Sequence, residues 1–337
     1  MRTGLRVAVM MLMLLASAGS AWLVYSWRQF AASPLPQVGS ATLQVEPGTS
    51  VHVLLRRLSR RYGQPLEYWK GLYWLEGQQR PIQAGEYRLI PGDTPRDLVQ
   101  RLLAGQVVEH VFRIQEGWNW RQLRAAVEHD ARLKMDLSPE TLQDLQRQLA
   151  PGAESLEGLF FPDSYRFQRG APASGLLLRA GRWMQQQLEQ AWQQRDRRID
   201  AWIETPYQAL ILASIVEKET AQVGEMPRIA GVFYNRLRKN MRLQTNPTVI
   251  YGLGEAFDGN LRRRDLRQPT PWNTYVIRGL PPTPICMPGR AAIDAVMRPE
   301  NHAYLFFVAD GSGGHYFSTH YEEHRRAVNQ YQIKDRP

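Results

Sequence analysis

The chain has 337 residues, of which 43% are hydrophobic and 22% charged, and this globular composition excludes a disordered or fibrous protein. Lysine and arginine number 42 against 32 acidic residues, and the net charge of +10 suits nucleic acid, anionic lipid or a carboxylate-bearing wall polymer. The single cysteine, Cys286, excludes an intramolecular disulfide and a multi-cysteine metal site.

An uncharged apolar segment occupies residues 7–27. As a helix, this segment spans the roughly 30 Å hydrocarbon layer of a membrane. Arg2 and Arg6 precede it, so we expect residues 1–28 to be a cytoplasmic stub and a single inner-membrane helix, with the remaining chain in the periplasm. The alternative is a cleaved signal peptide, because residues 16–18 (ASA) resemble a cleavage site. Both interpretations exclude cytoplasmic nucleic acid as a partner.

A proline-containing linker is predicted over residues 29–40, followed by a small α/β module over residues 41–108. In this module a short strand, a Pro-Gly turn and a leucine-rich helix occur twice, beginning at residues 42–46 and 86–90. The layout resembles the LysM type of glycan-binding domain. A spacer domain without a ligand is the alternative.

A larger mixed α+β domain is predicted over residues 109–332, which makes the fold class α+β. Its segment 156–167 (LEGLFFPDSYRF) combines aromatic rings with carboxylates, as sugar-binding sites do. This segment supplies Glu157 and Tyr165 as candidate supporting residues. The alternative is a buried loop whose carboxylates accept backbone hydrogen bonds.

The most informative predicted helix begins at Pro206, with Thr205 as its cap. Residues 209–216 carry no charge, so the helix should be buried on all sides. Glu217 follows immediately. Burial there would raise the pKa of Glu217 and keep it protonated near neutral pH, as a general acid requires.

Glu217 and Glu219 lie two residues apart, which separates them by about 200° around a helix. They therefore do not form a catalytic pair. Glu217 continues a row of apolar positions, so we expect it to face the cleft and Glu219 to have a supporting role. The alternative is that Glu217 pairs with Lys218 or with an arginine.

Two loop segments, 241–252 and 271–275, are rich in uncharged hydrogen-bonding side chains. Amides, hydroxyls and aromatic rings suit a neutral polyhydroxylated ligand. The chain has no P-loop or dinucleotide fingerprint, and we expect no cofactor. The candidate substrate-binding residues are Gln244, Thr245, Asn246, Thr248, Tyr251, Asn273, Thr274 and Tyr275.

The sequence pattern near the carboxyl end predicts a β-hairpin over residues 304–318, followed by a helix capped by Thr319. Three histidines, His315, His320 and His324, allow a zinc hydrolase as an alternative function. However, the His-Glu-x-x-His arrangement is missing, and His315 is more simply a surface residue of the hairpin. We therefore expect no metal site.

Six segments together resemble the endolytic murein transglycosylases of the YceG/MltG family. They occur in order along the chain, and the match covers the part from about residue 157 to residue 331. Asn246 departs from the pattern, since the family usually carries aspartate there. The segments are 213–220 (ASIVEKET), 233–237 (FYNRL), 243–252 (LQTNPTVIYG), 273–275 (NTY), 279–282 (GLPP) and 307–311 (FVADG).

The resemblance implies a membrane anchor, a LysM-like subdomain and a catalytic domain with one essential glutamate, which maps onto Glu217. Asn235 becomes a further supporting candidate. The implied reaction cleaves the β-1,4 bond between N-acetylmuramic acid and N-acetylglucosamine of nascent glycan strands, leaving 1,6-anhydro ends and ending strand elongation. Peptidoglycan strands are the implied substrate, and peptidoglycan synthases are further candidate partners. The alternative is a non-catalytic, membrane-tethered scaffold for wall synthases.

Overall fold

The computed structural model describes residues 2–36, 41–77 and 80–333. Within these ranges the chain forms two compact units. The first comprises the residues up to His110 together with Gln168–Gly170, and the second comprises Val111–Phe167 and the chain from Ala171 onward. Each unit has its own hydrophobic core.

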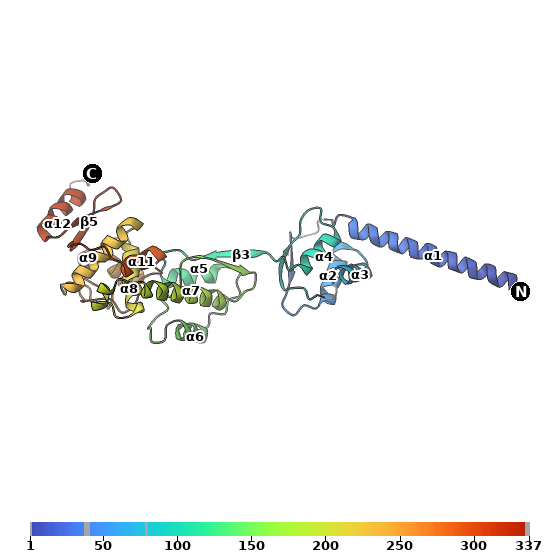
Figure 1. Cartoon of the computed structure of the whole chain (residues 1–337), viewed down its shortest axis with the longest axis horizontal. Coiled ribbons are helices and arrows are strands. Elements are labelled where there is room, and N and C mark those ends of the chain that lie inside the picture. The colour runs from blue at the N-terminus through green and yellow to red at the C-terminus, as the bar shows by residue number, and fades with distance from the viewer. Residues whose placement is uncertain (1, 37–40, 78–79, 334–337) are drawn as a thin grey trace. The chain divides into compact units, whose positions relative to one another are not determined.

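The first unit combines helices with a two-stranded antiparallel sheet (Figure 1). In this sheet Thr42 pairs with Arg88 and Val45 with Gly85. Both predicted strand-turn-helix units are confirmed, as β1 with α2 and β2 with α4. The elements of the unit are α1 (Arg2–Ala32), β1 (Thr42–Val45), α2 (Val51–Tyr62), α3 (Leu66–Gly77), β2 (Gly85–Arg88) and α4 (Pro95–Leu103).

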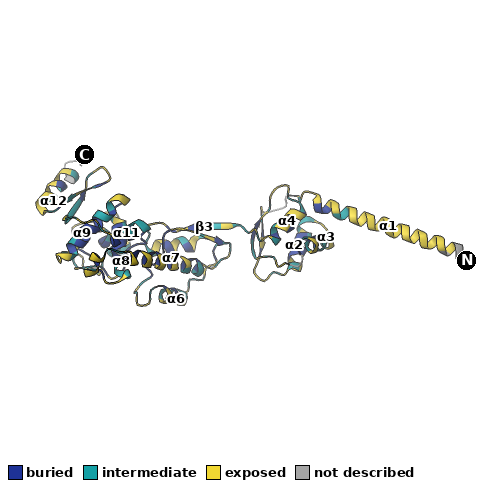
Figure 2. Ribbon diagram, in the orientation of Figure 1, coloured by how far each residue is buried: buried dark blue, intermediate teal, exposed yellow. Residues whose placement is uncertain are grey.

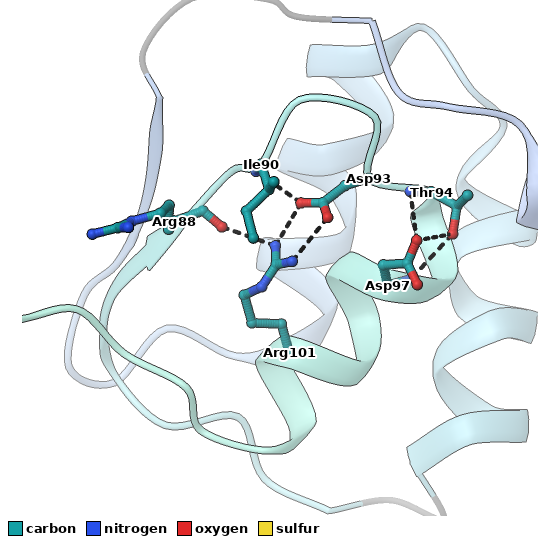
Figure 3. A network of polar contacts seen from close by, with 6 residues as sticks. All are labelled: Arg88, Ile90, Asp93, Thr94, Asp97 and Arg101. Atoms are coloured by element: carbon teal, nitrogen blue, oxygen red, sulfur yellow. Dashed lines mark hydrogen bonds and ion pairs between the residues drawn. The ribbon is translucent and has the colours of Figure 1, made fainter.

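Side-chain hydrogen bonds fix the turn between β2 and α4 (Figure 3). The Thr94 hydroxyl accepts a bond from the Asp97 N–H (3.2 Å), and the Asp97 carboxylate accepts one from the Thr94 N–H (2.9 Å). Arg101 donates two bonds to the Asp93 carboxylate (2.6 and 2.8 Å) and one to the Arg88 carbonyl (2.9 Å). Because the ion pair is largely shielded from water, it holds α4 against the end of β2.

Helix α1 is long and apolar enough to cross a membrane over residues 6–32, and residues 6–25 are exposed (Figure 2). A signal sequence would meet the same criteria. The helix continues to Ala32, so the first four residues of the predicted linker 29–40 are helical. The physical reason is packing, because Phe30 is buried against aromatic residues of α3. Residues 37–40 of that linker lie outside the described residues.

The second unit is predominantly helical and has small two-stranded sheets, β3 with β4 and β5 with β6. The predicted α+β class is therefore confirmed. The strands and α-helices from residue 109 onward are β3 (Glu109–Arg113), α5 (Trp120–His129), α6 (Pro139–Leu149), β4 (Ser164–Gln168), α7 (Ala173–Gln193), α8 (Pro206–Glu219), α9 (Met226–Arg238), α10 (Asn246–Leu253), α11 (Arg290–Met297), β5 (Phe306–Ala309), β6 (His315–Ser318) and α12 (Tyr321–Val328). Short 3₁₀ helices span Arg197–Ala201, Val223–Glu225, Gly254–Ala256 and Asp265–Arg267, and a π-helical turn spans Asn329–Ile333.

Helix α8 lies at the centre of this unit, in contact with α7, α9, α10 and α11. Every residue from Ala209 to Val216 is buried, as the uncharged sequence predicts. The predicted cap is confirmed, since the Thr205 hydroxyl accepts from the Gln208 N–H (3.2 Å). The Gln208 side-chain oxygen accepts a further hydrogen bond from the Glu204 N–H (2.7 Å). The burial and capping of α8 fix the position of its charged end.

The carboxyl-terminal hairpin pairs Phe306 with Ser318 and Ala309 with His315, which confirms the prediction. Helix α12 follows. Its first turn is preceded by His320, and no side chain caps it, so the prediction that Thr319 caps this helix is wrong.

Candidate functional site

The two glutamates at the end of α8 are directed at different parts of the second unit. The Glu219 carboxylate accepts a hydrogen bond from the hydroxyl of Thr245, in the segment that precedes α10. The Glu217 carboxylate accepts one from the backbone N–H of Gly289 (3.0 Å), which directly precedes α11. The two carboxylates thus lie in separate surroundings, as their angular separation on the helix predicts.

Buried threonines hold the segment around Thr245 in place. The Thr245 N–H donates to the Thr274 hydroxyl (3.0 Å), and that hydroxyl also bonds the hydroxyl of Thr248 (2.8 Å). The adjacent Gln244 N–H donates to the Thr274 carbonyl (3.1 Å). Gln244 itself has a φ of 49°, a left-handed conformation that costs energy in a residue other than glycine. These bonds maintain that conformation.

A cavity of about 410 Å³ opens beside Glu219 and is called the Glu219 cavity here. Three of the predicted binding residues, Gln244, Asn246 and Tyr275, line it. The Tyr275 hydroxyl donates to the Asn246 side-chain oxygen (2.7 Å). The remaining lining residues are Arg236, Leu243, Phe306, Phe307, Val308, Ala309, His315, Tyr321, His324 and Val328.

The surroundings of Glu219 favour a protonated carboxyl group. Burial raises the pKa of Glu219, and the Thr245 hydroxyl and the proximity of His315 and Arg236 oppose this effect. Arg236 is itself buried and donates to the carbonyls of Leu305 and Leu243, both at 2.7 Å. A carboxyl that is enclosed, hydrogen-bonded and open to a cavity is suited to donate a proton to a ligand.

The sequence predicts that His315 is a surface residue of the hairpin, but its side chain is largely buried. Its Nδ1 lies 2.7 Å from one oxygen of Glu225, whose other oxygen accepts the His315 backbone N–H (3.0 Å). Because Glu225 holds the ring at Nδ1, the imidazole is fixed at the edge of the Glu219 cavity. His324 stacks on Phe306 instead, with ring centroids 5.2 Å apart.

Glu217 lines neither of the two cavities that contain predicted binding residues, the Glu219 cavity and the cavity beside Tyr251. Burial raises the pKa of Glu217, the Gly289 N–H opposes this, and the nearby Glu116 adds to it. A side chain at Gly289 would collide with Glu116, so the two carboxylates and the start of α11 are closely packed. Glu217 therefore connects the end of α8 to the start of α11 through its hydrogen bond with Gly289.

A second cavity, of about 740 Å³, contains Glu157 and is called the Glu157 cavity here. The Glu157 carboxylate accepts bonds from the Trp120 N–H (2.9 and 3.0 Å) and from the Tyr251 hydroxyl (3.0 Å). Burial raises the pKa of Glu157 to about 7, against these hydrogen bonds. Trp272 and Lys218 also line this cavity, which therefore offers aromatic and charged groups to a ligand.

The two cavities flank the same two chain segments. Lys218 lines the Glu157 cavity and the next residue, Glu219, lines the other. In the same way, Pro247 lines the Glu157 cavity and Asn246 lines the Glu219 cavity. Both cavities therefore border the end of α8 and the start of α10.

Several other predicted site residues make hydrogen bonds within the protein. Asn273 is fully buried and donates to the Gln268 carbonyl (2.7 Å), and Asn235 donates to the carbonyls of His302 (2.8 Å) and Tyr304 (3.0 Å). Tyr165 donates to the Phe161 carbonyl (2.6 Å). With Thr248 and Thr274, these side chains position loops and do not line the Glu219 cavity.

Sequence reasoning missed Arg236 and His315 as cavity residues. Arg236 lies within the quoted segment 233–237, yet an arginine in an amphipathic helix usually faces solvent. His315 lies 96 residues beyond Glu219, and only the tertiary fold brings it close. The signal available for Arg236 was its position on the inward, apolar face of α9.

Comparisons with known proteins agree on one family. The sequence model of the YceG-like family matches residues 43–330. The endolytic murein transglycosylase of Bacillus subtilis strain 168 is 29% identical over 268 residues, which cover 74% of this chain and 73% of that protein. The endolytic murein transglycosylase of Streptococcus pneumoniae strain D39 is 30% identical over 198 residues, which cover 57% of this chain and 35% of that protein.

A solved structure is similar as well. The crystal structure of a YceG-like protein from Listeria monocytogenes is 27% identical to this chain, with a TM-score of 0.57. The similarity covers 85% of this chain and 97% of the Listeria protein.

Proposed function

The chain belongs to the YceG-like family, and from this membership we propose that it is an endolytic peptidoglycan lytic transglycosylase whose catalytic acid is Glu219. The observation that carries the assignment is the shared cavity of Glu219, Gln244, Asn246 and Tyr275. Such a cavity combines one proton donor with groups that bind a polyhydroxylated ligand.

Glu219 replaces Glu217 as the proposed acid on geometric grounds. A general acid must come within hydrogen-bonding reach of the bond that it cleaves. Glu219 opens to the cavity that three of the predicted binding residues line, whereas Glu217 accepts the Gly289 N–H at the start of α11. The sequence-based argument for a raised pKa applies to both residues, so position decides between them.

The proposed reaction needs a single carboxyl group. Glu219 donates its proton to the glycosidic oxygen, and the bond from that oxygen to the anomeric carbon of N-acetylmuramic acid breaks. The Glu219 carboxylate then takes the proton of the muramic 6-hydroxyl, whose oxygen bonds to the anomeric carbon. The product is a 1,6-anhydro end, and no water is consumed. A hydrolase would instead need a second carboxylate or an activated water.

The glycan strand is proposed to extend through both cavities. Asn246 and Tyr275 would bind the sugar nearest Glu219, and Gln244 would orient it. In the Glu157 cavity, Trp272 and Tyr251 offer aromatic faces to a further sugar of the strand. This arrangement suits cleavage within a strand rather than at its end.

The proposed location is the inner membrane, with α1 as a single-pass anchor, its amino terminus in the cytoplasm and the second unit in the periplasm. Arg2 and Arg6 before the apolar segment support this orientation. From the same family membership we propose three further properties. They are a LysM-like role for the first unit, peptidoglycan synthases as partners, and the ending of strand elongation.

The test is mass analysis of the fragments that the full chain releases from purified peptidoglycan. We expect muramic ends one water lighter than reducing ends. Reducing muramic ends would identify a hydrolase, and no release of fragments would favour a non-catalytic scaffold.

A further inference from the structure

Helix α1 does not leave the first unit as a free tether, because its last turns pack on α3. The Ser26 hydroxyl is bonded to the Tyr68 hydroxyl (2.9 Å), and the Trp27 ring N–H donates to the Tyr68 carbonyl (3.4 Å). Phe30 packs edge-on against Trp69, with ring centroids 5.1 Å apart. The unit is thereby fixed to the helix that carries the apolar segment.

The contacts between the two helices place α3 beside the end of the apolar segment of α1. Phe30 contacts Tyr68 and Trp69, and Trp27, one turn earlier on α1, lies 3.5 Å from where a side chain would begin on Gly71. Residues 68–71 of α3 therefore lie beside residues 26–30 of α1.

Two large apolar side chains project from the carboxyl-terminal half of α3. Trp74 is 65% exposed and Leu75 is 56% exposed. They lie three and four residues beyond Gly71, or about 4.5 to 6 Å along the helix axis. Because Gly71 lies beside Trp27, Trp74 and Leu75 are close to the end of the apolar segment of α1.

We propose that Trp74 and Leu75 insert into the lipid–water interface of the bilayer that α1 crosses. A hydrocarbon layer of about 30 Å takes up about 20 helical residues, so an anchor that starts near Arg6 leaves the layer near Ser26. Trp74, close to Trp27, then lies near the interface that tryptophan prefers, and the exposed Arg28 of α1 follows just beyond the end of the hydrocarbon layer.

The consequence is a fixed attachment of the first unit to the membrane surface. One helix alone would let the unit rotate and tilt freely, whereas α1 and the end of α3 together give two points of contact. The proposal rests on α1 as the anchor and is independent of the catalytic assignment.

The test measures the depth of single spin labels in the full chain, reconstituted in nanodiscs of phosphatidylethanolamine and phosphatidylglycerol. Labels are placed by Leu75→Cys, by Gln64→Cys at an exposed position two residues before α3, and by Leu14→Cys in α1. The buried native Cys286 stays in place, and the unsubstituted chain controls for its labelling. Collisions with oxygen report lipid, and collisions with a water-soluble nickel chelate report water.

We expect the ratio of oxygen to nickel collisions at position 75 to lie clearly above that at position 64 and below that at position 14. Equal ratios at positions 75 and 64, with position 14 in lipid, would overturn the proposal. Protection of position 75 in native membranes but not in nanodiscs would also overturn it, because a protein would then cover the surface. Water access at position 14 would contradict the anchor itself.

Discussion

The hydroxyl of Thr245 donates a hydrogen bond to the carboxylate of Glu219. Thr245 is buried, and its backbone is held in turn by Thr274. The bond therefore joins the end of α8 to the start of α10 and fixes the carboxyl group at the cavity. It also stabilises the charged form of Glu219, so it opposes the effect of burial on the pKa.

Replacing Thr245 by valine should impair Glu219 without removing it. We expect a loss of roughly 10- to 100-fold in the cleavage rate, because the carboxyl group loses the partner that orients it. The pKa of Glu219 should rise further, so the alkaline fall of the rate should move to higher pH. The pH dependence of cleavage measures both effects. Thr245→Ser retains the hydroxyl and should stay near wild type, and an unchanged pH profile in Thr245→Val would refute the role of the bond.

Arg236 should be required for stability. Its replacement by methionine leaves the buried carbonyls of Leu243 and Leu305 without their donor, which should cost about 3 kcal/mol. Arg238→Met is the matched control on the same helix, because Arg238 is exposed. Thermal unfolding of the two variants compares them directly, and equal losses would contradict the assignment.

Gln244 should lower the stability of the fold through its backbone conformation and support cleavage through its side chain. Its left-handed backbone suits glycine, so Gln244→Gly should stabilise the fold by about 1 kcal/mol while weakening cleavage through the lost side chain. Asn240 has a similar φ of 51° and lies outside the cavity, so Asn240→Gly should leave cleavage unchanged. Equal cleavage by both variants would exclude a binding role for Gln244.

Glu157 should make stability depend on pH. Its pKa of about 7 in the folded chain lies above the ordinary value of 4.5, so the folded state binds the proton more tightly. The resulting stability is present below pH 4.5 and is lost as the pH rises to 7, by about 3 kcal/mol at most. Glu157→Gln lacks this dependence, so its stability relative to wild type should increase over that range. A constant difference between the two unfolding free energies would contradict the raised pKa.

The sequence was sufficient to predict α8, including its Thr205 cap, its buried body and its charged end. It was insufficient to choose between Glu217 and Glu219. In a helix that is apolar on all sides, periodicity does not distinguish a cleft from a packed interface. The choice depends on which loops meet the last turn of α8, and these lie around Thr245 and Gly289, far along the chain.

The same limit applies to other parts of the fold. The carboxyl-terminal hairpin follows from local alternation and glycine content, and its strands were predictable. The helical residues 29–32 follow from burial of Phe30 on α3, a contact between segments that no local pattern specifies. The contact between His315 and Glu225 likewise forms only through the tertiary structure.

The most direct test of the central claim compares Glu219→Gln with Glu217→Gln in the assay of fragments released from purified peptidoglycan. Both substitutions keep the size of the side chain, and circular dichroism checks that both variants are folded. We predict that Glu219→Gln loses at least about 100-fold in rate, while Glu217→Gln releases fragments with the same anhydro ends as wild type. Loss of release in Glu217→Gln with activity retained in Glu219→Gln would contradict the account.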